Sequence, residues 1–268
     1  MFLLSNTQMA RISQFFPLAH GLVRADDRRV ISGIIFVIRN GPKRRDVPMS
    51  YGPHKAIQNR FIRWSEMGVF GRIFVELAKG GGGTEETMID ATHLKAHRTA
   101  ASLLKKGLFP KHIGRTKGGL NSKLHTVCDS EGRPRTLLLT AVQVSDYTGA
   151  AALLSSLPPA KALLADKGHD ADRFRDALAE RKVVACIPSK LQRKIHIPND
   201  KALYRNRRKL ENMFGKLKDW RRIHTRYDRC AHTFMSAIAI VAIVIFWIRS
   251  TSPEPSTQAQ NPRRAHAL

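Results

Sequence analysis

The chain has 268 residues, 43% of them hydrophobic, which is enough to build a core and excludes a disordered protein. Lysine and arginine number 46 against 21 aspartate and glutamate, so the formal net charge is +25. This charge favours a polyanionic partner, with nucleic acid as the first interpretation and an anionic membrane surface as the lesser one.

The cysteines, Cys128, Cys186 and Cys230, are odd in number and widely separated, which suits a reducing cytoplasm better than a disulfide framework. His93 and His97 stand close together without a partner motif, so a structural zinc site is not expected.

Residues 1–79 are predicted to form a run of helices, with starts at residues 5–7, at Asp26 and near Pro53. A helix over residues 53–67 would have an apolar side and, roughly opposite to it, a basic side. The apolar side holds Ile57, Phe61 and Trp64, and the basic side holds Lys55, Asn59 and Arg63. The basic side is either an ordinary solvated face or a surface that meets DNA.

Four glycines, residues 80–83, predict a flexible joint between two domains. Beyond it, strand-like runs around Asp90, from Lys123 and from Arg135 predict an antiparallel meander. A helix from Asp146, a strand ending at Asp166, a helix and a further strand then predict parallel additions to the sheet. The fold class is therefore α/β, with a mixed sheet in residues 84–249.

Four other segments also allow predictions. A basic loop is either a linker or a contact for DNA, and it contains Lys105, Lys106, Lys111, Arg115, Lys117 and Lys123. The apolar run 234–248 is shorter than the roughly 20 residues that a membrane span needs, which favours a buried terminal helix. Residues 189–200 are expected to be a loop, and residues 250–268 have the composition of a disordered tail.

Two aspartates end predicted strands, Asp90 after TMI and Asp166 after ALLA, where open sheets place ligands. An acidic residue at such a position is also a common turn former, so neither aspartate indicates a site alone.

A third acidic residue lies on a predicted helix from about Ala202 to Arg222. At about 100° per residue, one stripe of that helix, within roughly 60°, holds Tyr204, Arg207, Glu211 and Lys218. The adjacent apolar arc would pack on the sheet and bring Glu211 to the strand ends. The simpler alternative is an amphipathic helix whose Arg207 and Glu211 form an i, i+4 ion pair worth a few tenths of a kcal/mol.

Phosphodiester chemistry explains three carboxylates in so basic a chain. Two hard cations about 3.5 to 4 Å apart can activate the attacking hydroxyl and stabilise the leaving oxygen. Carboxylate oxygens suit Mg²⁺ or Mn²⁺, whereas without metal the clustered anions would repel one another. Arg207 and Lys218 could hold flanking phosphates.

The spacing Tyr204-x2-Arg207-x3-Glu211-x6-Lys218 resembles the Y-R-E-K signature of bacterial insertion-sequence DDE transposases like those of the insertion sequence 5 family. The resemblance extends through MIDATHLKAHRTAASLLKKG, ADKGHDADRFRDAL and LENMFGKLKDWRRIHTRYDRCAHTF, and through two N-terminal segments, so that it covers nearly all of the chain to about Arg249. The family usually has a tyrosine where this chain has His169, and a tryptophan near residues 41–45.

The resemblance implies a ribonuclease-H-like catalytic domain after a small helical DNA-binding domain, residues 1–79. It further implies dependence on Mg²⁺, with Mn²⁺ as a substitute, recognition of inverted terminal repeats, cleavage that frees a 3′-OH, and strand transfer into target DNA. Asp90, Asp166 and Glu211 would be the catalytic metal ligands, and Tyr204, Arg207 and Lys218 would contact DNA. A homo-oligomer on DNA, a cytoplasmic location at the nucleoid and no membrane partner are expected.

Two rival functions remain open at this point. One is a plain metal-dependent nuclease that cuts without joining, and the other is a DNA-binding protein whose catalysis has lapsed.

Overall fold

The computed structural model describes residues 2–17, 26–80, 85–102 and 110–248. Most of the predicted glycine joint, the first part of the basic loop with Lys105 and Lys106, and the C-terminal tail lie outside the described residues.

The N-terminal part consists of helices, as predicted. They are α1 (Asn6–Ala10), α2 (Asp27–Asn40), α3 (His54–Glu66) and α4 (Val69–Lys79). The Ser5 hydroxyl accepts from the Gln8 amide at 3.1 Å while the Gln8 side chain accepts from the Ser5 amide, so α1 begins with a capping box. Asp26 caps α2, and Gly41 ends it in the left-handed region at φ 62°. The predicted helix starts are confirmed.

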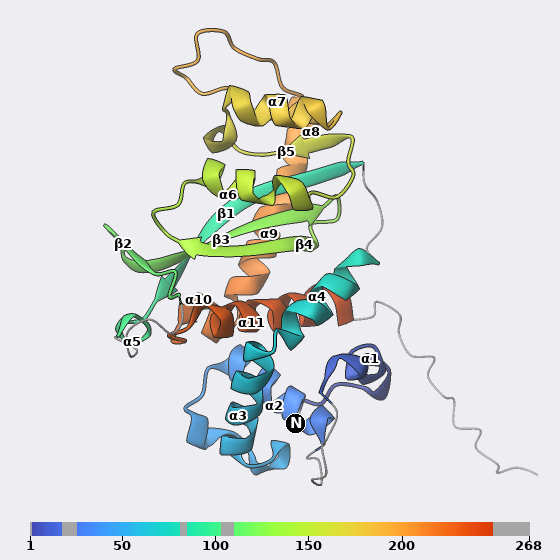
Figure 1. The fold of residues 1–268 in the computed structure, drawn as a ribbon, viewed down its shortest axis with the longest axis vertical. Coiled ribbons are helices and arrows are strands. Elements are labelled where there is room, and N and C mark those ends of the chain that lie inside the picture. Colours follow the sequence, from blue (N-terminus) through green and yellow to red (C-terminus); the bar gives the residue numbers. More distant parts are fainter. Residues whose placement is uncertain (1, 18–25, 81–84, 103–109, 249–268) are drawn as a thin grey trace, which may run out of the picture.

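A mixed sheet forms the centre of the C-terminal part (Figure 1). Its strands are β1 (Glu86–Ala96), β2 (Gly114–Thr116), β3 (Gly119–Asp129), β4 (Pro134–Ala141), β5 (Ala162–Leu164), β6 (Val184–Cys186) and β7 (Thr225–Arg226). β1, β3 and β4 pair antiparallel, and β5 and β6 join β1 in parallel, so the order is β4-β3-β1-β5-β6 with β1 at the centre. The predicted meander with parallel additions is confirmed.

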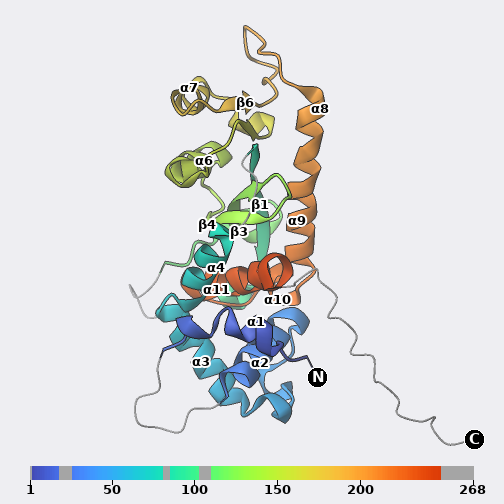
Figure 2. The ribbon, with the colours of Figure 1, turned by 90° about the vertical axis from the view of Figure 1, so that its right-hand side faces the viewer.

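Helices cover both faces of this sheet (Figure 2). One face carries α6 (Asp146–Leu153) and α7 (Asp172–Glu180), and the other carries α8 (Lys201–Tyr204) and α9 (Arg208–Lys218). Because side chains alternate along a strand, Ile89 packs with the first pair of helices, whereas Met88 and Leu94 pack with α9. Asp90 therefore shares the α9 face.

Asp90 lies in the middle of β1, which corrects the expectation that it ends a strand. The strand continues because β1 pairs with β3 as far as Lys95, with Asp90 opposite Thr126. Its parallel pairing with β5, however, stops at Met88, so Asp90 lies just beyond the point where β5 leaves β1.

The predicted helix 202–222 is also interrupted. Helical backbone runs from Lys201 to Lys218, but Trp220 is extended (φ −86°, ψ 121°) and a separate α10 (Arg221–His224) follows. Trp220 is buried in the same hydrophobic cluster as the apolar side of α9. The part that carries the polar stripe is therefore continuous, and only its end differs.

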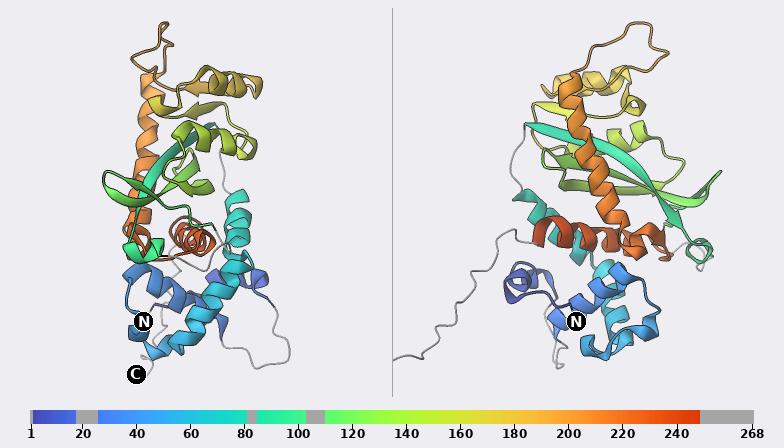
Figure 3. Two further views of the ribbon diagram at one scale, coloured as in Figure 1. Left: turned by 60° about the vertical axis from the view of Figure 1, so that its left-hand side comes forward. Right: turned by 180° about the vertical axis from the view of Figure 1, so that it is seen from behind.

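α11 (Ala231–Ala242) and the π-helical turn Ile243–Ile248 lie between the sheet and the N-terminal helices (Figures 1 and 3). Among the described residues, Ala231–Ile248 is the one helix long and apolar enough to cross a membrane, and 78% of it is buried inside the protein. Its packing against α2, α3 and α4 confirms the expected buried terminal helix and joins both parts in one hydrophobic cluster. The short α5 (Arg98–Ala101) follows β1.

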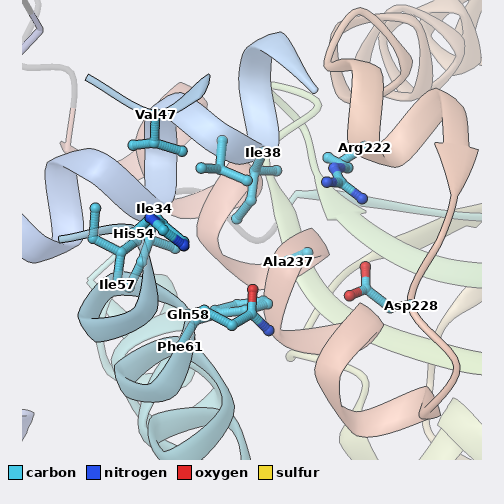
Figure 4. A pocket seen from close by; sticks show the side chains of 11 residues that line it. Ile34, Ile38, Val47, His54, Ile57, Gln58, Phe61, Arg222, Asp228 and Ala237 are labelled. Carbon is cyan, nitrogen blue, oxygen red and sulfur yellow. The ribbon is translucent and has the colours of Figure 1, made fainter. Parts of the chain in front are cut away.

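A pocket opens at this junction, between α2, α3, α10 and α11 (Figure 4). Its lining is apolar with a polar rim made by His54, Gln58, Arg222 and Asp228. None of the three candidate carboxylates lines it.

Candidate active site

Asp90 is held on the α9 face of β1 by two contacts. Its Oδ1 accepts from the Ala91 amide at 2.7 Å, and its Oδ2 accepts from the Arg207 guanidinium. Only 12% of the Asp90 side chain is exposed. Burial raises the pKa of Asp90 above its ordinary value, and the nearby Asp166 raises it further, while Arg207 opposes both. A buried carboxylate such as Asp90 is stable in its ionised form only beside a positive charge, which Arg207 supplies.

Asp166 comes two residues after β5 and shares a strand face with Leu164, which packs on the α9 side. Its Oδ1 accepts from the Gly168 amide at 2.9 Å and from His169 Nδ1 at 2.7 Å. The hydrogen bond from His169 lowers the pKa of Asp166 below its ordinary value. Asp166 is therefore near enough to Asp90 to influence its pKa, and the pKa values of the two carboxyl groups are shifted in opposite directions.

Arg207 connects Asp90 to Glu211. One guanidinium nitrogen donates to Asp90 and another donates to Glu211 Oε1 at 2.9 Å. Burial alone would lower the pKa of Arg207, but the acidic groups around it raise it overall. Glu211 is 61% exposed. The i, i+4 pair of the simpler alternative thus exists, but it is one half of a bridge to the sheet.

The other two residues of the stripe lie in different surroundings. Tyr204 is close to the acidic side chains of the site, and burial raises its pKa. Lys218 instead donates from Nζ to Thr92 Oγ1 at 2.6 Å, and burial lowers its pKa. The structure therefore brings Tyr204 and Arg207 to the aspartates and holds Lys218 one step further along the same face of β1.

The oxygen donors suit a hard divalent cation, and two buried polar atoms near them, Arg207 Nε and Thr126 Oγ1, have no hydrogen-bond partner within the described residues. No three acidic, histidine or cysteine side chains among the described residues surround one point closely enough to hold a metal. The Arg207 guanidinium separates Asp90 from Glu211 and fills the place of a cation there. The carboxylate oxygens are chemically suited to a divalent metal, but in this arrangement Arg207 occupies the place between Asp90 and Glu211.

The predicted basic side of α3 is confirmed as a surface: Lys55, Asn59 and Arg63 are exposed, and Ile57, Phe61 and Trp64 are buried. The helix α3 lies on the opposite side of α11 from β1 and α9, the elements that carry Asp90 and Glu211 (Figure 1). The expected basic loop needs a correction at Lys123, which is buried on β3 and donates to Val144 O at 2.8 Å and to Asp146 at 3.1 Å. Arg115 and Lys117 are exposed, and Lys111 donates to backbone carbonyls of residues 101 and 102.

Sequence reasoning missed two features. His169 differs from the tyrosine that the resemblance implies, and it contacts Asp166 directly. The outer side of α8–α9 carries four exposed cations, Lys201, Arg205, Arg208 and Lys216. In the sequence these cations recur every three or four residues, except that the uncharged Asn212 stands between Arg208 and Lys216. This helical spacing was the signal that could have revealed them.

A family model described as the transposase DDE domain matches residues 81–247 of this chain. The chain belongs to the DDE transposase family. A second model, described as a transposase of the IS4/5 family, matches residues 4–74. The matches confirm the resemblance found from the Y-R-E-K spacing.

Relatives of the transposase support the same assignment. A protein described as a transposase for insertion sequence element IS6501 of Brucella ovis is 33% identical over 131 residues, which is 48% of this chain and 100% of the relative. One for insertion sequence element IS402 of Burkholderia cepacia is 28% identical over 153 residues, 50% of this chain and 70% of the relative.

The fold of the transposase is shared with the piggyBac transposase solved in a synaptic complex with hairpin DNA. The TM-score is 0.54 at 9% identity, over 89% of this chain and 69% of that one. The mixed sheet with helices on both faces is thus the ribonuclease-H-like fold of DDE transposases, and the transposase is an enzyme of DNA cleavage and strand transfer.

Proposed function

We propose that the transposase cuts DNA at the inverted terminal repeats of its own insertion sequence, using Asp90, Asp166 and Glu211 as ligands of Mg²⁺. The observation that carries the proposal is the Arg207 bridge. Side chains from β1 and α9 share one cation, and Asp166 lies near enough to affect the pKa of Asp90.

Divalent metal, when bound by these carboxylates, would activate the attacking hydroxyl and stabilise the leaving oxygen of a phosphodiester. The chain's own residues prepare that place. Asp90 and Asp166 are fixed by backbone amides, so their orientation is set before any ligand arrives. Arg207 balances the negative charge of Asp90 and Glu211, and once it is displaced it is free to donate to a DNA phosphate next to them.

DNA would reach the carboxylates over the outer side of α8–α9. Lys201, Arg205, Arg208 and Lys216 are exposed there and form no ion pair with any acidic residue that the structure describes. Such cations contact phosphates and hold the duplex in place without reading sequence. Sequence would be read by the N-terminal part, where the basic side of α3 is the proposed contact.

The relative solved with hairpin DNA is a synaptic complex, and by analogy we infer that the transposase acts as a homo-oligomer that holds two element ends. From the proposed DNA substrate we infer that the transposase acts in the cytoplasm at the nucleoid.

One assay separates transposition from the two rival functions. Purified full-length protein, Mg²⁺ and an end-labelled duplex carrying the inverted repeats that flank the gene are incubated with a supercoiled target plasmid. Cleavage followed by covalent joining to the plasmid is expected. Cleavage without joining would indicate a plain nuclease, and binding without cleavage would indicate a lapsed enzyme; either result contradicts the proposal.

A further inference from the structure

The carboxylate of Asp166 is held by hydrogen bonds to only one of its two oxygens. Both of its hydrogen bonds fall on Oδ1, from the Gly168 amide at 2.9 Å and from His169 Nδ1 at 2.7 Å. Its Oδ2 receives no hydrogen bond from any residue that the structure describes. Because an ionised carboxylate only accepts, the contact requires the imidazole to carry its proton on Nδ1.

The residues around this contact fit a fixed geometry. The tight turn Lys167–His169 begins at Asp166 and returns the imidazole to it. His169 is 1% exposed, and its ring packs against Phe174 of α7 with centroids 6.1 Å apart. A Cβ on Gly168 would lie 2.9 Å from Asp166 Oδ1, so a glycine is what permits the close approach of the amide. The imidazole cannot swing away without disturbing the packing of α7.

We propose that His169 is a positioning residue, whose Nδ1–H fixes Asp166 Oδ1 so that Oδ2 is presented to the metal. This inference rests on the proposed function, because it assumes that Asp166 is a metal ligand. Hydrogen bonds from outside the ligand set orient a ligand and commonly matter tenfold or more for metal affinity.

A purely structural role for His169 makes a different prediction. If the ring only fills space beneath α7, any replacement of similar size should serve, and the loss of metal binding should follow the loss of stability. Asparagine and glutamine distinguish the two roles. The side-chain amide nitrogen of asparagine stands as many bonds from the backbone as Nδ1 does, whereas that of glutamine stands one bond further, in the manner of Nε2.

The test measures Mn²⁺ binding to the full-length protein without DNA, by electron paramagnetic resonance of free Mn²⁺, together with melting temperatures. We expect His169→Gln and His169→Leu to weaken Mn²⁺ binding by about 10- to 100-fold and His169→Asn to remain within a few-fold of the wild type. Unchanged binding in His169→Gln and His169→Leu would overturn the inference. Equal losses in the asparagine and glutamine variants that follow their melting temperatures would also overturn it.

Asp166→Asn serves as the reference in the same titration. If it binds Mn²⁺ as the wild type does, Asp166 is no ligand, and the proposed site fails together with the role of His169. If Asp166→Asn loses binding while the His169 variants keep it, the site stands and only the inference about His169 fails.

Discussion

At the scale of single residues, Arg207 binds two carboxylates that are also proposed to be metal ligands. It donates to Asp90 and to Glu211, so it is the counter-charge of both. Lys218 lies on the same stripe but donates to Thr92, a neutral partner. Arg207 and Lys218 lie on one stripe of the predicted helix, but their different partners indicate different roles.

Replacing each by alanine should reveal that difference. Arg207→Ala should lower the cleavage rate by about ten- to a hundredfold, because a charge-assisted hydrogen bond to the DNA is worth about 1.5 to 3 kcal/mol. It should leave Mg²⁺ affinity without DNA equal or higher, because a cation that competes for the carboxylates is gone. Lys218→Ala should slow cleavage without changing the Mg²⁺ titration. If Arg207→Ala cleaves at the wild-type rate, Arg207 only forms an ion pair and takes no part in cleavage.

At the scale of elements, Asp170 anchors the irregular segment 189–200 to α7. Its side chain is 1% exposed and accepts from Arg175 at 2.9 Å, from Arg193 at 3.1 Å and from the Lys190 amide at 2.8 Å. Burial would raise the pKa of Asp170, but these three donors outweigh burial and lower it from the ordinary 3.8. Folding therefore favours the ionised form.

This shift predicts a pH dependence. Asp170→Asn should lower the free energy of unfolding at pH 7 by about 3 kcal/mol, because it breaks a buried ion pair. The stabilisation by wild-type Asp170 is complete above its ordinary pKa and is lost as the pH falls through the lower folded pKa. Urea unfolding from pH 7 down to pH 3 should thus show the two proteins converging in acid. Asp172→Asn, the control, removes an exposed partner of the same Arg193 and should lower the free energy of unfolding by under about 1 kcal/mol. An equal loss in the Asp170 and Asp172 variants would show that Asp170 does not anchor the segment.

What could be predicted from the sequence depends on the range of the interaction. The helix starts at Ser5 and Asp26 follow from side chains that accept hydrogen bonds from backbone amides two or three residues further along, and a local sequence pattern contains both partners. The alternation along β1 likewise predicted a strand. Its full length depends on pairing with β3, more than twenty residues away, and so Asp90 was placed at an end.

The same limit applied at the site. Lys123 reads as part of a basic loop, and only the tertiary fold brings Asp146 to it and buries it. The three carboxylates were predicted from spacing and remain predictions as ligands, but nothing local to Arg207 could show that it also contacts Asp90 in another element. His169 is the exception, because Asp166 and Gly168 stand next to it in the sequence.

At the scale of the whole molecule, one hydrophobic cluster spans both family matches, and it includes Trp64 and Phe70 as well as Phe234 and Trp247. The N-terminal helices therefore rest on α11, and their DNA contacts should be tested in the full chain. A fragment that ended at the glycine joint would expose the sides of α2, α3 and α4 that α11 covers.

Lys55 and Arg63 on α3 supply the matching prediction. The double variant Lys55→Ala/Arg63→Ala should weaken binding to the element end and reduce the slope of log affinity against log salt by about 0.9 for each phosphate that is no longer neutralised. Lys79→Ala is the control, since Lys79 is an exposed lysine on α4 paired with Glu76 at 2.9 Å. Fluorescence anisotropy over a range of salt concentrations measures all three proteins. An equal effect per charge in the control would mean that net charge, and not the α3 surface, governs affinity.

In the proposed function, three carboxylates of separate elements form one metal-dependent catalytic site. The most direct test replaces Asp90→Asn, Asp166→Asn and Glu211→Gln one at a time and measures, with Mg²⁺, the cleavage rate at the element end beside the affinity for the same DNA. Each variant should abolish cleavage and keep DNA affinity within a few-fold, because each removes a metal ligand and no phosphate contact. Near-normal cleavage by any one of the three would contradict the site as proposed.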